Sequence, residues 1–411
     1  MVTTNAVGTP TTEVLGGRLR WSLAVDQGLG CLGLYSVLPV LGVLLASGSS
    51  AAFVGIGLFS YSASAGLSAM LLNRWLTRLT YLRGMAGSMV LSGVAFGLLP
   101  HVSSPIARCG LLVVAGLGVS VHFLMSRVLV AEELRSDIGR NRMYSMLQIA
   151  VNVAAAVGPF IGGFLILVDA RLLLATVAAC YVLAGVALFF GVPADLRPAP
   201  AVSRWPISRE VLRWAVVDPP TRRLVLIGAT GAFVYGHFYS AIALLVARDF
   251  AESKFLRGAL IAGPALAIAV FQGPVTVLVT RLMRGGATPF TVLVHGTVIF
   301  TLALVTLGLD VPVLWGTAVA VALFALAEMV FTPMQSTAFA GLAVQSKFEA
   351  FNLRQVCWTV GEALGSLAGG SVFLTMYHDG LHHTYWLVLA VLVFAVTVAL
   401  AWTSRARPAL R

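Results

Sequence analysis

Long runs of apolar residues alternate with short polar gaps along the whole chain. A hydrocarbon core about 30 Å thick requires about 20 apolar residues of helix, and in lipid a helix satisfies its own backbone polar groups. Twelve runs reach this length, so the pattern predicts an all-α membrane protein with twelve transmembrane helices. The predicted spans are residues 21–45, 50–72, 84–101, 108–131, 142–168, 171–193, 223–248, 256–282, 288–309, 312–336, 351–376 and 382–403.

The longest polar gap divides these spans into two groups of six. Five prolines interrupt it: Pro198, Pro200, Pro206, Pro219 and Pro220. Within it, WPISREVLRW has apolar residues toward one side of a short helix, which suits either a helix lying on the membrane surface or a solvated linker. The predicted parts are an N-terminal tail (1–20), a six-helix bundle (21–193), a linker (194–222), a second six-helix bundle (223–403) and a C-terminal tail (404–411).

Composition and charge agree with a membrane location. The chain is 59% hydrophobic and 10% charged, whereas soluble domains are about 25% charged. The net charge of +11 lies in gaps between spans rather than on one face, so nucleic acid is not an expected partner. Most of the 27 cations fall on the side of the linker, so the positive-inside rule places both termini in the cytoplasm. Arginine greatly outnumbers lysine, which suggests a bacterial inner membrane protein; we expect a monomer.

Signals for enzymatic chemistry are missing from the sequence. There is no P-loop and no Gly-rich nucleotide fingerprint after a strand. The four cysteines, Cys31, Cys109, Cys180 and Cys357, lack the spacing of metal ligands. His378, His382 and His383 form only a weak metal-site pattern. We therefore expect neither an enzyme nor a bound metal or cofactor; a proton gradient is the expected energy source.

The stretch AAAVGPFIGGFL at residues 154–165 places Gly158, Pro159, Gly162 and Gly163 inside one span. Small residues let helix backbones approach closely in lipid, and neighbouring helices can satisfy the backbone that proline frees. A similar stretch, GSLAGG at 365–370, lies 207 residues later, about half the chain. This offset indicates an internal repeat in which the two bundles are related by pseudo-symmetry.

Twelve spans, a repeated half and a basic central loop resemble the major facilitator superfamily. VGPFIGG is similar to the antiporter motif of its drug:proton antiporter branch, although Ala150 and Ala154 stand where that motif has further glycines. The resemblance implies two bundles around a central cavity, with this motif packing tightly between the halves. Ordinary glycine packing without a functional role is the alternative.

A second resemblance lies after the second span. Arg74 and Arg78 match arginines of the superfamily's cytoplasmic gating motif, whereas Asn73 stands at the position of its aspartate. The resemblance implies that these three residues contribute to a gate on the cytoplasmic side. Solvated loop residues are the alternative interpretation.

Ionisable residues within spans are costly and mark functional sites. Asp26 and Arg127 lie about 8 Å and about 6 Å from the same membrane side at 1.5 Å per residue. Arg127 also resembles the intramembrane arginine of the superfamily's fourth-helix motif. The resemblance implies that the first and fourth helices lie together beside the central cavity, so we predict that Asp26 and Arg127 pair. Burial favours a neutral carboxyl group and a nearby guanidinium favours a charged one, so a change in their separation would load or release a proton at Asp26. A static ion pair is the alternative.

Glu328, ahead of Pro333 in the tenth predicted span, is a second candidate. It could carry a second proton, bind a cationic substrate or hydrogen-bond a backbone group that the proline frees.

Polar and aromatic residues within the spans are candidates for lining a substrate cavity. His122, His237 and His295 could carry protons instead of the carboxylates, but a histidine among aromatic residues, such as His237, is more often packed and hydrogen-bonded. The cavity candidates are Tyr35, Gln148, Asn152, Tyr235, His237, Tyr239, Gln272 and Glu362.

The sequence therefore predicts a secondary transporter that works by alternating access. Its expected partners are protons, a small-molecule substrate and the lipid bilayer. The favoured activity is proton-coupled export of small amphipathic molecules such as drugs or natural products. A proton-coupled importer or facilitator of the same fold is one alternative, and a lipid-handling or receptor-like protein without proton coupling is another.

Overall fold

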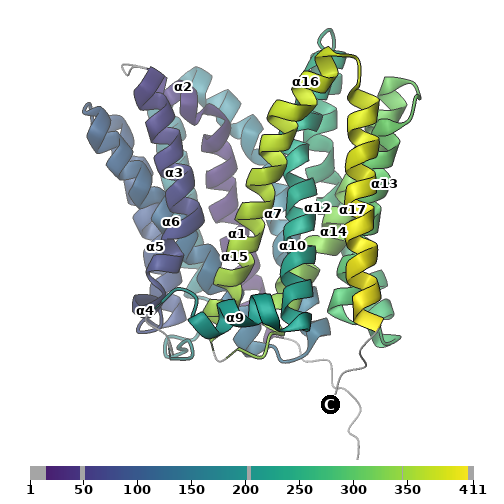
Figure 1. Ribbon diagram of the computed structural model, residues 1–411. Helices are drawn as coiled ribbons and strands as arrows, with labels where there is room; N and C mark the ends of the chain where they lie inside the picture. Colours follow the sequence, from purple (N-terminus) through teal and green to yellow (C-terminus); the bar gives the residue numbers. More distant parts are fainter. Residues whose placement is uncertain (1–14, 47–50, 201–204, 345, 406–411) are drawn as a thin grey trace, which may run out of the picture.

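The structure is a computed structural model that describes residues 15–46, 51–200, 205–344 and 346–405. Every regular element in these ranges is helical. Twelve helical segments run back and forth between two ends of the molecule, which confirms the predicted twelve-helix fold (Figure 1). We call the end at which the linker helix Arg209–Val217 lies the linker end, and the opposite one the far end.

Six segments form the first half. One of them consists of two helices, α1 and α2, joined by a short 3-10 turn, and another, α5, ends in a 3-10 turn. Their bounds are α1 (Gly17–Val37), η1 (Leu38–Val40), α2 (Leu41–Ala46), α3 (Ala51–Leu71), α4 (Asn73–Leu76), α5 (Tyr81–Leu98), η2 (Leu99–His101), α6 (Pro105–Glu133), α7 (Asp137–Val168) and α8 (Ala170–Leu188).

The second half follows a short helix in the linker. Two of its segments contain a π-helical turn. The bounds are α9 (Arg209–Val217), α10 (Pro219–His237), η3 (Phe238–Ile242), α11 (Ala243–Asp249), α12 (Lys254–Arg284), α13 (Pro289–Gly308), α14 (Val313–Ala340), α15 (Lys347–Leu367), η4 (Ala368–Val372), α16 (Phe373–His378) and α17 (His382–Arg405).

Ten helical segments of the described residues are long and apolar enough to cross a membrane, and Ile56–Leu71 of α3 forms a shorter apolar helix. The remaining segment contains α15, which carries Arg354 and Glu362 among its apolar residues. Its polar content distinguishes it from the other spans. The helix starts follow capping rules, since Ser104, Ser136 and Thr288 each accept a hydrogen bond from the backbone N–H three residues later.

Corresponding helices pack in the same way in the two halves. In the first half α1 packs along α7, and α5 packs along α6 and α8. In the second half α10 packs along α15, and α13 packs along α14 and α17. Between the halves, α7 packs against α12 and α14, and α6 contacts α15. This arrangement agrees with a duplicated six-helix unit.

Apolar contact between the halves is concentrated at the linker end. One hydrophobic cluster combines residues of the first half, such as Leu124, Val128 and Tyr144, with Phe348 and Phe351 of the second. We call it the linker-end cluster. The other clusters formed by described residues each belong to a single half, one of them together with Val211 of the linker.

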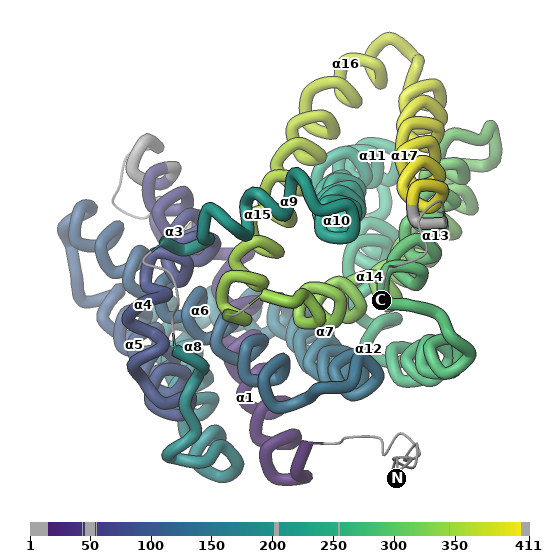
Figure 2. Tube along the Cα trace, turned by 60° about the horizontal axis from the view of Figure 1, so that its bottom comes forward, coloured from purple at the N-terminus to yellow at the C-terminus, as the bar shows by residue number. Residues whose placement is uncertain are grey.

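Both described ends of the chain lie at the linker end (Figure 2). The two bundles touch there, close to α9, and spread apart toward the far end (Figure 1). Helix α9 packs on α10 and buries Val211, while Leu212, Val216 and Val217 stay exposed. The molecule is therefore held closed at the linker end.

Candidate functional site

Asp26 of α1 forms a buried pair with His122 of α6. The distance between Asp26 Oδ2 and His122 Nε2 is 2.5 Å, and the two residues are 0% and 2% exposed. The second carboxylate oxygen, Oδ1, has no hydrogen-bond partner among the described residues. The pair joins two helices of the first half and contains two titratable groups that share one hydrogen bond.

The predicted pairing of Asp26 with Arg127 is therefore wrong. His122 and Arg127 lie five residues apart on α6, and a helix turns by about 100° per residue, so their side chains leave the helix in different directions. His122 points toward α1, whereas the Arg127 guanidinium lies 5.6 Å from the centre of the Phe123 ring. Matching depth along two helices does not ensure that two side chains share a face.

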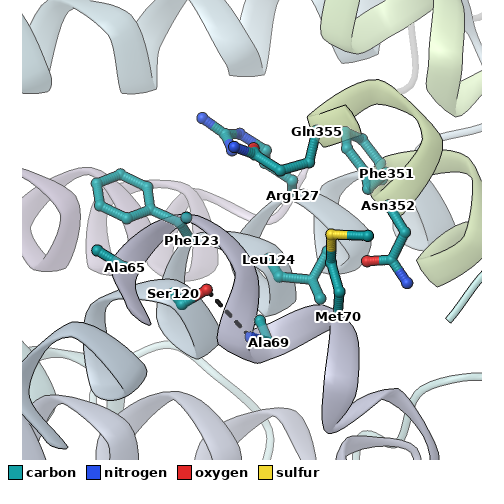
Figure 3. A pocket seen from close by; sticks show the side chains of 11 residues that line it. Ala65, Ala69, Met70, Ser120, Phe123, Leu124, Arg127, Phe351, Asn352 and Gln355 are labelled. Atoms are coloured by element: carbon teal, nitrogen blue, oxygen red, sulfur yellow. Dashed lines mark hydrogen bonds between the residues drawn. The ribbon is translucent and has the colours of Figure 1, made fainter. Parts of the chain in front are cut away.

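Arg127 instead lies at the boundary between the halves, where it lines two small hollows. The first hollow is enclosed by α3, α6 and α15, and Figure 3 shows its residues as sticks. It is lined by Ala65, Gly66, Ala69, Met70, Ser120, Phe123, Leu124, Arg127, Phe351, Asn352 and Gln355. The second is lined by Gln27, Phe123, Arg127, Tyr144, Leu147, Gln148, Val151, Thr332, Pro333 and Ser336. Each contains residues of both halves.

Glu328 and Gln148, two residues singled out from the sequence, meet across this boundary. The Gln148 side-chain amide on α7 donates a hydrogen bond to Glu328 Oε1 on α14, at 3.0 Å. Asn152, one turn along α7, donates to the Gln148 backbone carbonyl at 3.0 Å. The carboxylate of one half is thus directly linked to the other half within the membrane-spanning region.

Tyrosines surround Glu328 on the side of the far end. The Tyr235 and Tyr239 hydroxyl groups are 3.2 Å apart, and Tyr239 is 61% exposed. Tyr35 of the first half lies within electrostatic reach of Glu328 and Tyr239. The structure thus gathers Tyr35, Gln148, Tyr235, Tyr239 and Glu328 into one polar and aromatic group. Glu362 lies farther along α15, half-buried and next to Trp358.

His237 and Gln272 belong to the packing of the second half instead. His237 donates from Nδ1 to the Phe233 carbonyl at 2.8 Å, so Nε2 accepts from the Tyr385 hydroxyl, also at 2.8 Å. Gln272 is fully buried and donates to the Met329 carbonyl at 3.0 Å. His237 is therefore a packed and hydrogen-bonded residue in this structure.

The glycines of α7 pack within the first half, so the expected packing between the halves is wrong. A Cβ on Gly158 would lie 2.7 Å from Tyr35 Cβ, and one on Gly162 would collide with the Ser36 carbonyl. Both neighbours belong to α1. Gly163 meets open space, and Pro159 is exposed within the helix. The second half repeats this contact, because Gly365 of α15 packs against the Phe233 backbone of α10.

Asn73, Arg74 and Arg78 lie at the linker end, in and just after α4. Asn73 is buried, whereas Arg74 and Arg78 are exposed and Arg78 stacks on Trp75 at 5.3 Å. The contact that closes this end in the structure is apolar: the rings of Tyr144 and Phe351 meet edge to face across the halves, 6.2 Å between centroids.

Arg354 is a boundary residue that the sequence analysis missed. It lies on α15, is 3% exposed, and has its guanidinium 5.6 Å from the Trp358 ring centre. The signal was present, since Arg354 falls inside the predicted span 351–376, where a charged residue marks a functional position.

Comparison with known proteins gives one family and two informative structural neighbours. The family described as Major Facilitator Superfamily matches residues 27–342. No curated protein matches the chain in sequence. The crystal structure of the human organic anion transporter MFSD10 (TETRAN) has a TM-score of 0.66 and 18% identity, over 92% of this chain and 99% of that one. A bacterial homologue of the iron transporter ferroportin, crystallised in its outward-facing state, has a TM-score of 0.68 and 14% identity, over 93% and 99%.

Proposed function

Because the chain belongs to the major facilitator superfamily, we propose that it is a proton-coupled secondary transporter that exports small amphipathic molecules by alternating access. The two structural neighbours, an organic anion transporter and a homologue of an iron transporter, support the general activity. We further propose that it acts as a monomer in a bacterial cytoplasmic membrane, with the linker end inside the cell. Within the superfamily, we propose that the chain belongs to the drug:proton antiporter branch.

The hydrogen bond between Gln148 and Glu328 is the observation that carries the coupling. An ionised carboxylate accepts a stronger hydrogen bond than a neutral acid. Protonation of Glu328 would therefore weaken a direct link between the halves, and loss of the proton would strengthen it. A residue that both titrates and links the moving parts can connect proton movement to a change of state.

The Asp26–His122 pair supplies a second titratable position, at the linker side of the first half. Both residues belong to the same half, so their contact does not change directly when the halves move apart. We propose that it takes up the proton from Glu328 or holds α1 against α6 while the halves move. The alternative from the sequence, a static buried pair, differs only in lacking a pH-dependent effect on transport.

The closed linker end fits one stage of an alternating-access cycle. The linker-end cluster separates the boundary hollows from that end of the molecule. Export needs this apolar contact to open so that substrate can enter, and then to close again before release at the far end. The exposed Tyr239 and its neighbours would then face the release path.

The function is tested with purified protein in proteoliposomes that contain a pH-sensitive dye. A panel of small amphipathic cations, anions and zwitterions is added in the presence and absence of a proton gradient. We expect at least one compound to cause proton movement, and we expect its uphill transport to stop in Glu328→Gln. The direction of movement relative to the gradient separates export from import. Substrate movement that is independent of the proton gradient would overturn the coupling.

A further inference from the structure

Two arginines lie on helices that meet at the boundary between the halves, one in each half. Arg127 lies on α6 and Arg354 on α15, each six or seven residues from the linker-end terminus of its helix. At 1.5 Å per residue this places both about 10 Å from those termini. Arg127 lines the hollow of Figure 3 together with Phe351, Asn352 and Gln355 of α15, the helix that carries Arg354.

Neither arginine has a carboxylate partner among the residues that the structure describes. The ion pairs found there join Asp26 with His122 and Asp137 with Arg140. Arg127 and Arg354 contact the aromatic faces of Phe123 and Trp358 instead. Arg354 is 3% exposed, and its Nε is buried without a hydrogen-bond partner.

This arrangement is energetically unfavourable as it stands. Arginine stays charged at physiological pH, and an unpaired charge removed from water is strongly penalised. An aromatic face returns only about 0.5–2 kcal/mol. Two such positive charges at one boundary therefore attract a negatively charged group strongly.

The hollow of Figure 3 offers further hydrogen-bonding groups beside Arg127. Gln355 and Asn352 of α15 line it together with Ser120 of α6, and the Asn352 amide already donates to the Pro206 carbonyl at 2.7 Å. The Ser120 oxygen already accepts a hydrogen bond from the Ala69 backbone N–H at 3.1 Å, which leaves its own proton available to a ligand. Guanidinium, amide and hydroxyl donors at one place match the acceptor oxygens of a carboxylate or phosphate.

We propose that this boundary binds the anionic group of the substrate, a carboxylate or phosphate ester, with Arg127 as the direct ligand and Arg354 as the compensating charge. The proposal deepens the proposed transport function, because it assigns a substrate class to the same boundary.

The bound anion has a consequence for the transport cycle. Repulsion between Arg127 and Arg354 opposes the approach of α6 and α15, and therefore opposes closure of the linker end. An anion between them turns this repulsion into two attractions. Its binding should favour the closed state, since a ligand shifts a population by its difference in affinity for the two states.

The test uses three ring compounds of similar size: benzoate, benzylamine and benzyl alcohol. Phenyl phosphate is added to separate carboxylate from phosphate binding. Thermal unfolding of the purified full chain is measured at constant ionic strength. We expect benzoate, phenyl phosphate or both to raise the Tm in a saturable way, while benzylamine and benzyl alcohol do not. Equal shifts with all four compounds, or with none, would overturn the proposal even if no variant can be purified.

Variants then locate the site. Arg127→Gln should abolish the anion-dependent shift, and Arg354→Gln should weaken apparent affinity at least tenfold. Arg142→Gln and Arg284→Gln remove exposed arginines near the linker end, one from each half, and should leave the shift unchanged. An undiminished shift in Arg127→Gln would overturn the assignment.

The experiments can contradict the proposed proton coupling and the proposed anion site independently of each other. Arginine-dependent anion binding without proton movement would contradict the coupling but support this site. Proton-coupled transport of a cation, with no arginine-dependent anion binding, would support the function and overturn the site.

Discussion

Gln148 of α7 donates a 3.0 Å hydrogen bond to Glu328 of α14, and this bond crosses from one six-helix half to the other. The two residues are 180 positions apart in the chain. Their contact exists only while the halves are docked in the observed arrangement. We therefore expect the protonation of Glu328 to depend on the relative position of the halves.

Exchange of the Gln148 and Glu328 side chains separates the hydrogen bond between the halves from the ability of Glu328 to titrate. Glu328→Gln keeps the volume and hydrogen-bonding capacity but cannot lose a proton, so uphill transport should fall to background while downhill exchange persists. The double variant Gln148→Glu/Glu328→Gln moves the carboxylate to the other half, and it should regain part of the proton-driven transport. Dye-loaded proteoliposomes provide the measurement. An unchanged pH profile in Glu328→Gln would show that another group carries the proton.

Stability measurements test the buried pair of the first half. Removal of one partner leaves the other buried group without its hydrogen bond, which costs about 1–3 kcal/mol, and more if that group is charged, so Asp26→Asn and His122→Asn should each destabilise. Their double variant should cost clearly less than the sum, with a coupling above about 1 kcal/mol. The cycle with Arg127→Gln in place of His122→Asn serves as control and should be additive within about 0.5 kcal/mol. Additivity between Asp26 and His122 would contradict the geometry.

The fold followed from the sequence because lipid imposes simple rules on long apolar runs. Span length, the proline-rich gap and the repeat at residue 365 together predicted two six-helix halves. The same rule singled out Asp26, Arg127 and Glu328, and two of these now line or link the boundary between the halves.

Pairing of side chains did not follow, because it depends on the rotation of each helix about its axis. Asp26 and Arg127 share a depth but not a face, and His122 occupies the face that was assigned to Arg127. The glycines of α7 raise the same problem, since their pattern signals a close helix contact without saying which helix approaches. Only the three-dimensional arrangement identifies α1, through Tyr35 and Ser36.

The α7 glycines provide a matched pair of substitutions. A Cβ on Gly162 would collide with the Ser36 carbonyl, whereas one on Gly163 meets open space. Gly162→Ala should therefore destabilise by about 1–3 kcal/mol or more, as overpacking does, and Gly163→Ala should be close to neutral. Thermal unfolding in detergent compares the two variants. Equal stability of both would show that α1 and α7 are not packed as described.

Orientation in the membrane is tested by labelling of single cysteines. The four native cysteines are first replaced, and Trp205→Cys and Asp379→Cys are then introduced separately at the linker end and the far end. With the linker end in the cytoplasm, an impermeant maleimide added to intact cells should label position 379 and spare position 205. Labelling at 205 from outside would reverse the orientation, and with it the proposed direction of export.

The contact between Tyr144 and Phe351 tests how the linker end is held closed. Phe351 is 2% exposed and meets the Tyr144 ring across the halves. Burial of a large apolar side chain contributes about 1.5–3 kcal/mol, and this contribution exists only in the closed state. Phe351→Ala should therefore shift the equilibrium at least tenfold toward an open linker end, since about 1.4 kcal/mol corresponds to a factor of ten.

Spin-label distances measure this shift directly. Labels at the exposed positions Arg142 and Arg284, one in each half at the linker end, should move apart in Phe351→Ala. Labels at Ile106 and Trp315, both exposed at the far end, should move together if the halves rock as rigid units. Phe164→Ala removes a ring that is already 67% exposed and should change neither distance. An unaltered distance at the linker end in Phe351→Ala would assign the closed state to other contacts, the link between Gln148 and Glu328 first among them.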